Sequence, residues 1–143
     1  GCSIGSKQGA NERLPYLINT PAYVRFISAE PLLEYFELPN YGITQCVYGG
    51  ESGPTTKIGK LDLSITKRMI DQAKEKGIKV FFKQIGSILS KEYKLADGHG
   101  GTFEQYPAGL EWLKIREIPD SHPCFNKIPE PHEIENEQQN LEL

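Results

Sequence analysis

The sequence has no long hydrophobic run, few cysteines and no excess of positive charge. No apolar stretch approaches the roughly 20 residues that a helix needs to cross a bilayer, and no charged-then-apolar leader opens the chain, so we expect a cytoplasmic protein. The formal net charge is −3 at pH 7, which gives no general attraction to nucleic acid or to an anionic membrane. Neither is therefore expected as a partner.

Cysteine and histidine are both too sparse and too scattered to predict a metal site. Cys2, Cys46 and Cys124 lie far apart, and no pair has the short spacing with which two thiolates hold one metal ion. We expect three reduced thiols and no metal. The three histidines lie in Gly- or Pro-rich stretches and are expected to be solvated loop residues: His99, His122 and His132.

The sequence does contain short apolar runs, which cover residues 2–4, 23–28, 43–48 and 78–82. β-branched and aromatic residues dominate the last three runs, as is typical of strands. Segments of helical pattern lie between the runs. This alternation predicts an α/β fold of about four parallel strands with crossover helices.

Three helices are predicted between the strands, at residues 11–19, 31–38 and 64–76. Pro15 fits the first of them only within its first turn, and Pro31 is placed at the first position of the second. The third carries an apolar stripe at 3.6-residue spacing, with Asp62 or Ser64 to cap its start and Gly77 to end it. That stripe consists of Ile65, Met69, Ile70 and Ala73.

The pattern weakens after Gly86. Several glycines in residues 87–110 indicate an irregular excursion, with a hairpin around Asp97-Gly98. From Pro119 onward, prolines and the acidic run 130–142 describe a tail with little to bury. We therefore divide the chain into residues 1–107, the α/β part, and residues 108–143, a tail rich in Pro and Glu.

Polar residues at the carboxyl ends of the strands are the candidate site, because parallel α/β folds bind ligands there. Glu30 follows the second strand, where a carboxylate acts as a general base or binds an amine or hydroxyl group of a ligand. The alternative is a cap on the following helix, whose start favours negative charge. Ser28 is its weaker companion.

The segment Gly49-Gly50-Glu51-Ser52-Gly53 follows the third strand directly. Its glycines allow the backbone to approach a ligand closely, and Glu51 sits inside the loop with Ser52 adjacent. The spacing matches neither a dinucleotide-binding nor a Walker loop, so it does not imply phosphate binding. The alternative is a tight turn with a solvated Glu51.

Lys83 and Gln84 end the fourth strand. A lysine among apolar neighbours is costly to bury unless a carboxylate or an anionic ligand meets it, and Glu51 or Glu30 is the natural partner. A structural ion pair and a catalytic pair are both compatible with this pattern. Arg25 is expected to be a structural charge inside the sheet. Lys7 and Gln8, after the first strand, are weaker ligand contacts.

We thus assign Glu51, Glu30 and Lys83 as candidate catalytic groups. Ser28, Gly49, Gly50, Ser52 and Gln84 are the candidate cofactor-binding residues.

Several of these stretches also resemble one family. The runs are residues 12–17, 20–22, 24–33, 47–53, 80–86 and 95–98, with ISAEPLL, GGESG and FFKQ in that order. They resemble a phage-associated family named for gene products thirty-seven and sixty-eight, over about residues 1–107. The chain departs from many relatives at Gly5-Ser6-Lys7, where they are more acidic.

The resemblance implies a partial (β/α) barrel, with the four strands of this chain making its later part. It also implies a radical-SAM-like enzyme, whose N-terminal region holds a [4Fe–4S] cluster through a cysteine cluster. This sequence does not contain that region. We therefore expect the substrate-facing C-terminal half of such an enzyme, inactive alone and without cofactor, whereas the full-length parent would use S-adenosylmethionine and the cluster. Gly49-Gly50-Glu51 shares letters with the Gly-Gly-Glu of radical-SAM enzymes, but it follows a late strand and does not imply the same role.

The alternative is a non-catalytic domain that binds a small molecule or a phage protein through the same strand ends; action on nucleic acid is suggested by the phage context alone. A half barrel leaves open strand edges and an apolar concave face, which are normally covered. We expect self-association, a missing N-terminal half as partner, or a tail that folds over the face. The apolar residues available for such a cover are Trp112, Leu113, Ile115 and Ile118.

Overall fold

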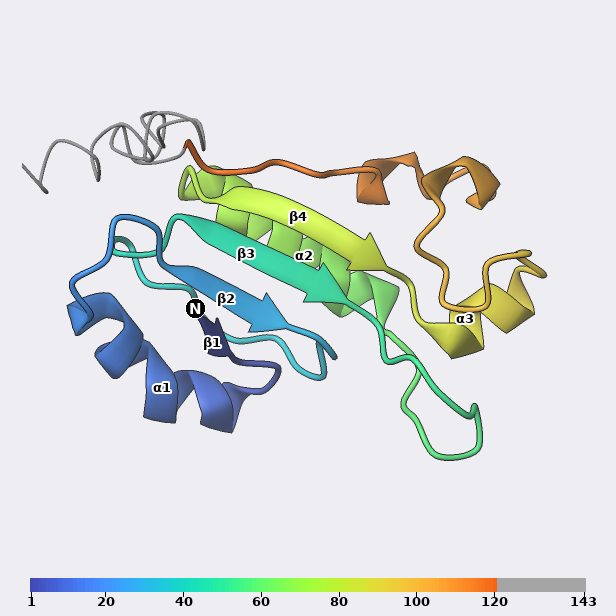
Figure 1. Cartoon of the computed structure of the whole chain (residues 1–143), viewed down its shortest axis with the longest axis horizontal. Coiled ribbons are helices and arrows are strands. Elements are labelled where there is room, and N and C mark those ends of the chain that lie inside the picture. Colours follow the sequence, from blue (N-terminus) through green and yellow to red (C-terminus); the bar gives the residue numbers. More distant parts are fainter. Residues whose placement is uncertain (121–143) are drawn as a thin grey trace, which may run out of the picture.

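The computed structural model describes residues 1–120, so His122, Cys124, His132 and the acidic run 130–142 lie outside the described residues. A parallel sheet of four strands organises the chain (Figure 1). The strands are β1 (Cys2–Ser3), β2 (Phe26–Ala29), β3 (Gln45–Gly49) and β4 (Lys79–Gln84), in the order β1-β2-β3-β4. The predicted α/β class and the four parallel strands are confirmed. The sheet is open and does not close into a barrel.

Helix α1 (Lys7–Asn19) connects β1 to β2, and helix α2 (Leu63–Glu75) connects β3 to β4. A short helix, α3 (Ser87–Glu92), follows β4, and two 3₁₀ turns lie at Phe103–Gln105 and Glu111–Leu113. The prediction of an irregular stretch after Gly86 missed α3, because six residues are too few for a clear periodicity.

Helix α2 forms where the sequence predicts it and for the predicted reasons. One carboxylate oxygen of Asp62 accepts hydrogen bonds from the amides of Ser64 (2.8 Å) and Ile65 (3.0 Å). The hydrogen bond from the Ser64 side chain, followed by these amides, lowers the pKa of the Asp62 carboxyl. Gly77 follows the helix with a φ of 68°, a conformation that favours glycine.

Helix α1 begins earlier than predicted, which corrects the position of Pro15. Ser6 caps the helix by accepting a hydrogen bond from the Gly9 amide (3.2 Å), so the helix starts at Lys7 and Pro15 lies in its interior. The proline removes one backbone donor there. Burial of Leu14 and Leu17 in the core on either side of it offsets that loss.

No helix forms at residues 31–38, so that prediction was wrong. The backbone amides that would continue a helix instead tie the connection to neighbouring strands. The Leu32 amide donates to the Gly49 carbonyl (3.0 Å), and the Leu33 amide donates to the Gly5 carbonyl (2.8 Å). The buried α2 residue Gln72 holds the far end of the connection, accepting from the Leu38 amide and donating to the Phe36 carbonyl.

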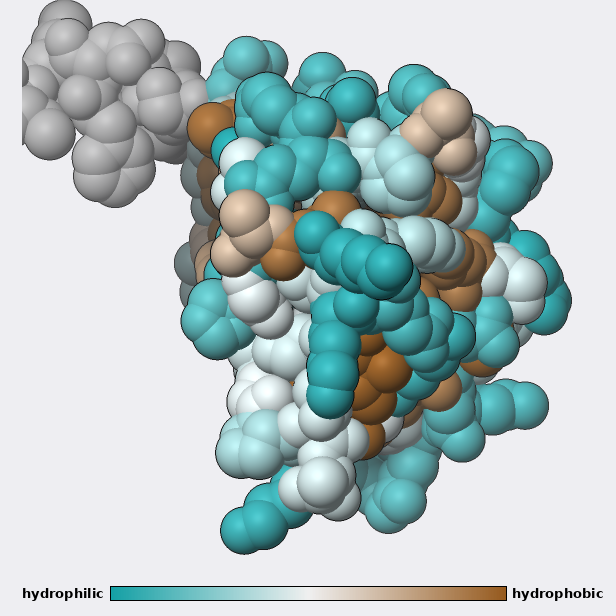
Figure 2. Space-filling model, turned by 90° about the vertical axis from the view of Figure 1, so that its right-hand side faces the viewer, coloured by the Kyte–Doolittle hydropathy of each residue, from teal (hydrophilic) through white to brown (hydrophobic). Residues whose placement is uncertain are grey.

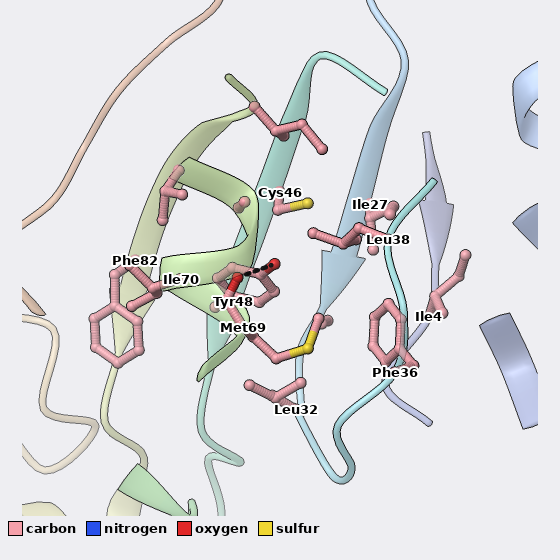
Figure 3. Packing of buried hydrophobic residues seen from close by; sticks show 14 of the residues in the cluster. Ile4, Ile27, Leu32, Phe36, Leu38, Cys46, Tyr48, Met69, Ile70 and Phe82 are labelled. Carbon is pink, nitrogen blue, oxygen red and sulfur yellow. Dashed lines mark hydrogen bonds between the residues drawn. The ribbon is translucent and has the colours of Figure 1, made fainter. Parts of the chain in front are cut away.

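One face of the sheet is buried. Side chains of the strands, of α2 and of the 31–38 connection fill it (Figure 3). Helix α1 adds Ala10, Leu14 and Leu17 to the same core. The hydroxyl of Tyr48 donates to the Met69 carbonyl in α2 (3.3 Å). Burial raises the pKa of the neighbouring Cys46 thiol to about 12, which keeps it protonated and unreactive. The strand residues on this face are Ile27, Ala29, Cys46, Tyr48, Val80 and Phe82.

The opposite face carries no helix within residues 1–120; α2 lies behind the sheet in Figure 1. Ser3, Ser28, Val47 and Phe81 are register partners across the four strands and form one row on this bare face. The last three are half-buried, and Phe26 is exposed. A parallel sheet is normally covered on both faces, so the bare face is the unusual feature of the fold.

The outer edge of β4 is covered, because residues 115–117 run antiparallel to it. The Phe82 amide donates to the Ile115 carbonyl (2.8 Å), and the Glu117 amide donates to the Val80 carbonyl (2.9 Å). Of the residues expected to cover the open face, Leu113 is buried, Trp112 and Ile115 pack against the core, and Ile118 is 73% exposed. This segment thus covers a strand edge and not the bare face.

The loop around Asp97 is no hairpin, which corrects that expectation. Its carboxylate accepts hydrogen bonds from the amides of His99 (3.0 Å), Gly101 (2.7 Å) and Thr102 (2.9 Å). These hydrogen bonds, led by that from His99, lower the pKa of Asp97 to about 2. The loop joins β4 because the Gly100 carbonyl accepts from the Ile85 amide (3.0 Å).

None of the helices in residues 1–120 has the length and apolarity needed to span a membrane.

Candidate functional site

Glu30 and Lys83 meet on the bare face at the carboxyl end of the sheet. Lys83 Nζ lies 3.3 Å from Glu30 Oε2, although β3 separates the strands that carry them. Gly49, the last residue of β3, lies beneath the pair: a Cβ at this position would be 3.2 Å from Glu30 Oε1. Because glycine has no side chain, Glu30 can cross β3 and reach Lys83. The predicted pairing of Lys83 with a carboxylate is confirmed, with Glu30 as the partner.

A register shift in β4 places Lys83 at this site. Tyr48 pairs with Phe82, but the next residue of β3, Gly49, pairs with Gln84, so Lys83 is the additional residue of β4. An extra residue of this kind re-aims side chains and is frequent beside active sites. Phe82 remains in the core, and the Lys83 side chain is 54% exposed. The expected cost of burying this lysine therefore does not arise.

One oxygen of Glu30 is buried without a hydrogen-bond partner. The Glu30 side chain is 20% exposed in total, and its Oε1 atom is the buried side-chain polar atom without a partner in the described part of the chain. Buried polar atoms are normally satisfied, so an unpaired one indicates strain or a site for a donor. The helix that Glu30 was alternatively expected to cap is absent, so capping is not its role.

Gln84 holds the Gly50-Glu51-Ser52 turn against the end of β4. Its Nε2 donates to the Gly50 carbonyl (3.1 Å) and to the Ser52 hydroxyl. The Gly50 amide donates to the Gln84 carbonyl (2.9 Å), and a Cβ at Gly50 would lie 2.3 Å from the Ile85 carbonyl oxygen. These polar groups form hydrogen bonds with one another, so the turn is fixed in place beside the Glu30–Lys83 pair.

Glu51 lies apart from the other two candidate catalytic groups. Its Oε2 accepts a hydrogen bond from the Gly59 amide (3.0 Å), so the carboxylate closes the loop that follows β3. Its backbone carbonyl accepts from the Ser87 amide (3.0 Å) at the start of α3. The structure brings Glu30 and Lys83 together and turns Glu51 towards its own loop.

Ser28 and a basic side chain adjoin the site on the bare face. Ser28 lies two residues before Glu30, in the row with Val47 and Phe81. The guanidinium of Arg116 lies 5.8 Å from the centre of the Phe81 ring and 4.2 Å from that of Phe103. Viewed from the carboxyl ends of the strands, apolar surface is exposed between hydrophilic side chains (Figure 2).

Lys7 and Gln8 line a separate hollow of about 920 Å³ at the start of α1, together with Glu34. The Lys7 amide donates to Glu34 Oε2 (2.9 Å), and Gln8 Nε2 donates to Glu12 Oε1 (2.8 Å). A carboxylate therefore already occupies this helix start, and the hollow has no unpaired buried charge. The Glu30–Lys83 pair remains the stronger candidate on chemical grounds, because one of its carboxylate oxygens is buried without a partner.

Sequence reasoning missed Arg116, which lies 33 positions after Lys83 in a stretch without periodicity. It also misplaced Arg25, which lies just before β2 and donates from Nε to the Thr20 carbonyl (2.7 Å) instead of standing inside the sheet. No local signal marks Arg116, because residues 115–117 are recognisable as a strand only through their partner β4.

The residues present do not fit an iron–sulfur cluster. Within residues 1–120, no three His, Cys, Asp or Glu side chains gather so that they could hold a metal ion. Cys46 is buried on the helix side of the sheet, away from the Glu30–Lys83 pair. The cluster implied by the family resemblance therefore has no ligand set in this part of the chain.

A family model described as "Protein of unknown function (DUF5131)" matches residues 1–125. No curated protein and no solved structure matches the chain significantly.

Proposed function

The chain belongs to the DUF5131 family, and we propose that it is the substrate-facing half of a (β/α)-barrel enzyme that binds a small polar molecule at the carboxyl end of its sheet. The observation that carries this proposal is the Glu30–Lys83 pair with its unpartnered carboxylate oxygen. In parallel α/β folds, ligands bind at this end of the strands.

The roles of the two side chains follow from their charges and surroundings. Glu30 accepts a hydrogen bond or a proton from an amine or hydroxyl group of the substrate. Lys83 neutralises negative charge on the substrate, and when the site is empty its ammonium group lies 3.3 Å from Glu30 Oε2. Gly49 leaves the space in which the two meet, and Gln84 fixes the adjoining turn.

Completion of the barrel is part of the proposal. The bare face, with its half-buried Val47 and Phe81, forms the interior of the barrel in the parent protein. Further strands join the sheet at β1, because residues 115–117 occupy the edge of β4. These strands come from an N-terminal half of the parent protein. A second copy of the chain is the alternative cover.

The motifs ISAEPLL, GGESG and FFKQ support a more specific proposal: a phage or prophage enzyme that resembles radical-SAM enzymes. Since the described residues hold no cluster ligands, the N-terminal region of the parent would supply them together with the S-adenosylmethionine site. Held by that region, these cofactors would supply radical chemistry. This chain contributes the side chains that bind and orient the substrate.

Two measurements test the proposal. The parent protein, reconstituted anaerobically with iron and sulfide, is expected to show a visible iron–sulfur absorption band; a colourless product would refute the radical-SAM part. Independently, a fragment library titrated into the ¹⁵N-labelled chain is expected to shift the amides of Gly49, Gly50 and Lys83. Shifts confined to the amino end of the strands, at Thr44 and Lys79, would refute the site itself.

A non-catalytic binding domain that uses the same surface is the second candidate. The internal pairing of Gln84, Ser52 and Glu51 favours it, because those groups are held by the fold and are not poised for chemistry. A parent protein that binds no cluster while the chain still binds ligands beside Glu30 would support this candidate.

A further inference from the structure

We propose that the ligand at the Glu30–Lys83 pair is a zwitterion: a compound with an ammonium and a carboxylate on one carbon and an apolar substituent, as in an α-amino acid. This inference rests on the proposed binding function of the site and adds the class of ligand. It follows from which polar groups at the carboxyl end of the sheet remain unsatisfied.

At the ion pair itself, one buried acceptor and several donors remain without partners. Gln84 already binds Gly50 and Ser52, and Glu51 already binds Gly59. Glu30 Oε1 has no partner, and Lys83 uses its ammonium group, with three donors, for a single long contact of 3.3 Å. A complementary ligand therefore presents a donor to Glu30 and an acceptor to Lys83.

The pair can open to admit such a ligand. Its contact is longer than that of the Lys60–Glu92 pair (2.6 Å), and the Lys83 side chain is 54% exposed. Exposed ion pairs stabilise a protein weakly, and the flexible lysine side chain changes its conformation at little cost in free energy. The ligand's ammonium group takes the place of Lys83 beside Glu30, and its carboxylate takes the place of Glu30 beside Lys83. Each side chain therefore keeps an oppositely charged partner.

Ligands of a single charge fit less well. A phosphate or carboxylate beside Lys83 is repelled by the Glu30 carboxylate, and a simple amine beside Glu30 is repelled by the Lys83 ammonium. A metal ion would find too few protein ligands at the pair, because no third acidic, His or Cys side chain of the described residues lies there. A molecule that carries both charges gains both attractions and avoids both repulsions.

The bare face predicts the remainder of the ligand. Val47 and Phe81 are half-buried in the row towards the sheet centre, and the Arg116 guanidinium borders the Phe81 ring. An apolar substituent that leaves the ion pair in this direction covers both side chains and gains free energy in proportion to the area buried. An aliphatic amino acid is therefore expected to bind more tightly than glycine.

The test uses L-leucine and two analogues, called its two halves here because each keeps one of its two charged groups. 3-Methylbutylamine keeps the ammonium group and 4-methylpentanoate keeps the carboxylate, and each compound is titrated into the whole ¹⁵N-labelled chain. We expect L-leucine to shift the amides of Gly49, Gly50 and Gln84. We also expect it to bind about ten-fold more tightly than either half, which corresponds to about 1.4 kcal/mol. Glycine is expected to bind more weakly at the same amides.

Variants at the pair identify the groups responsible. Glu30→Gln and Lys83→Met are each expected to weaken L-leucine binding about ten-fold, whereas the matched pair Glu92→Gln and Lys60→Met, which removes a similar exposed ion pair, leaves it unchanged. Circular dichroism spectra that match the parent chain show that each variant is folded. An equal loss in both sets of variants would overturn the assignment.

The remaining outcomes separate this inference from the proposed function. Equal binding of L-leucine and one of its halves beside Gly49 overturns the zwitterion but keeps the site. An absence of any shift with L-leucine also overturns the zwitterion, and the fragment titration then decides whether the site binds another class of ligand. Shifts only at the amino end of the strands overturn both.

Discussion

The two faces of the sheet differ in what each contributes. On the helix-covered face, Cys46, Tyr48, Val80 and Phe82 are fully buried, and every strand takes part in one core. On the bare face, the alternate residues of the same strands are half-buried or exposed, and the charged Glu30 and Lys83 lie there. Because side chains alternate along a strand, a single β4 segment serves stability with Phe82 and the candidate site with Lys83. The buried core and the candidate site thus lie on opposite faces of the sheet.

Truncation of one phenylalanine on each face is the strongest test of this comparison. Phe82→Ala removes a fully buried ring and is expected to lower the free energy of unfolding by about 4 kcal/mol. Phe81→Ala, on the bare face, is expected to cost about 1 kcal/mol. Urea denaturation followed by circular dichroism measures both. Equal losses would mean that the bare face is covered in solution.

The two glycines at the end of β3 provide the next test. Gly50→Ala places a Cβ 2.3 Å from the Ile85 carbonyl oxygen, so the backbone must shift, and we expect a loss of about 3 kcal/mol. In Gly49→Ala the new Cβ meets side chains and no backbone, with Glu30 Oε1 at 3.2 Å and Gln84 Cγ at 3.6 Å. We expect this change to cost less than about 1 kcal/mol while displacing Glu30 from Lys83. Thermal unfolding gives the first difference, and the ligand titration gives the second. A larger loss for Gly49→Ala would reverse the interpretation.

Acidification probes the Asp97 loop, which anchors the segment that follows β4. Because folding lowers the pKa of Asp97 from 3.8 to about 2, its contribution to stability is fully present above pH 3.8 and is lost as the pH falls towards 2. Asp97→Asn is expected to be less stable than the parent chain at pH 6, and the two are expected to converge near pH 2. Urea midpoints across this range measure the difference; a constant gap would contradict the prediction.

The smallest expected effect belongs to the candidate site. Glu30→Gln and Lys83→Met are each expected to change stability by less than about 1 kcal/mol, because the ion pair is partly exposed. Chemical denaturation of both variants, beside Lys60→Met as control, measures this. A loss of several kcal/mol would make the pair a structural element.

Sequence patterns predicted the elements better than the site. Helix α2 and the strands follow from periodicity, because an apolar stripe or alternation reflects a buried face directly. The connection 31–38 has a helical composition but donates its amides to Gly5 and Gly49, partners far away in sequence. Patterns of neighbouring residues cannot predict contacts of this kind.

The candidate site, too, was predicted from the sequence only in part. Glu30, Gly49, Lys83 and Gln84 were identified because they end strands, and they do lie together. Which carboxylate meets Lys83 depends on the register shift between β3 and β4, and the orientation of Glu51 depends on the Gly59 amide. Both are three-dimensional outcomes of pairing, so the sequence left the partner of Lys83 open.

The antiparallel strip at residues 115–117 also limits how copies of this chain can associate through their sheets. Head-to-tail stacking, in which the β1 of one copy joins the β4 of the next, would generate an open-ended filament. With the β4 border already occupied, β1-to-β1 contact remains, and that contact is symmetric and ends at two copies. The strip of three residues thus removes the edge of β4 itself from direct contact between copies.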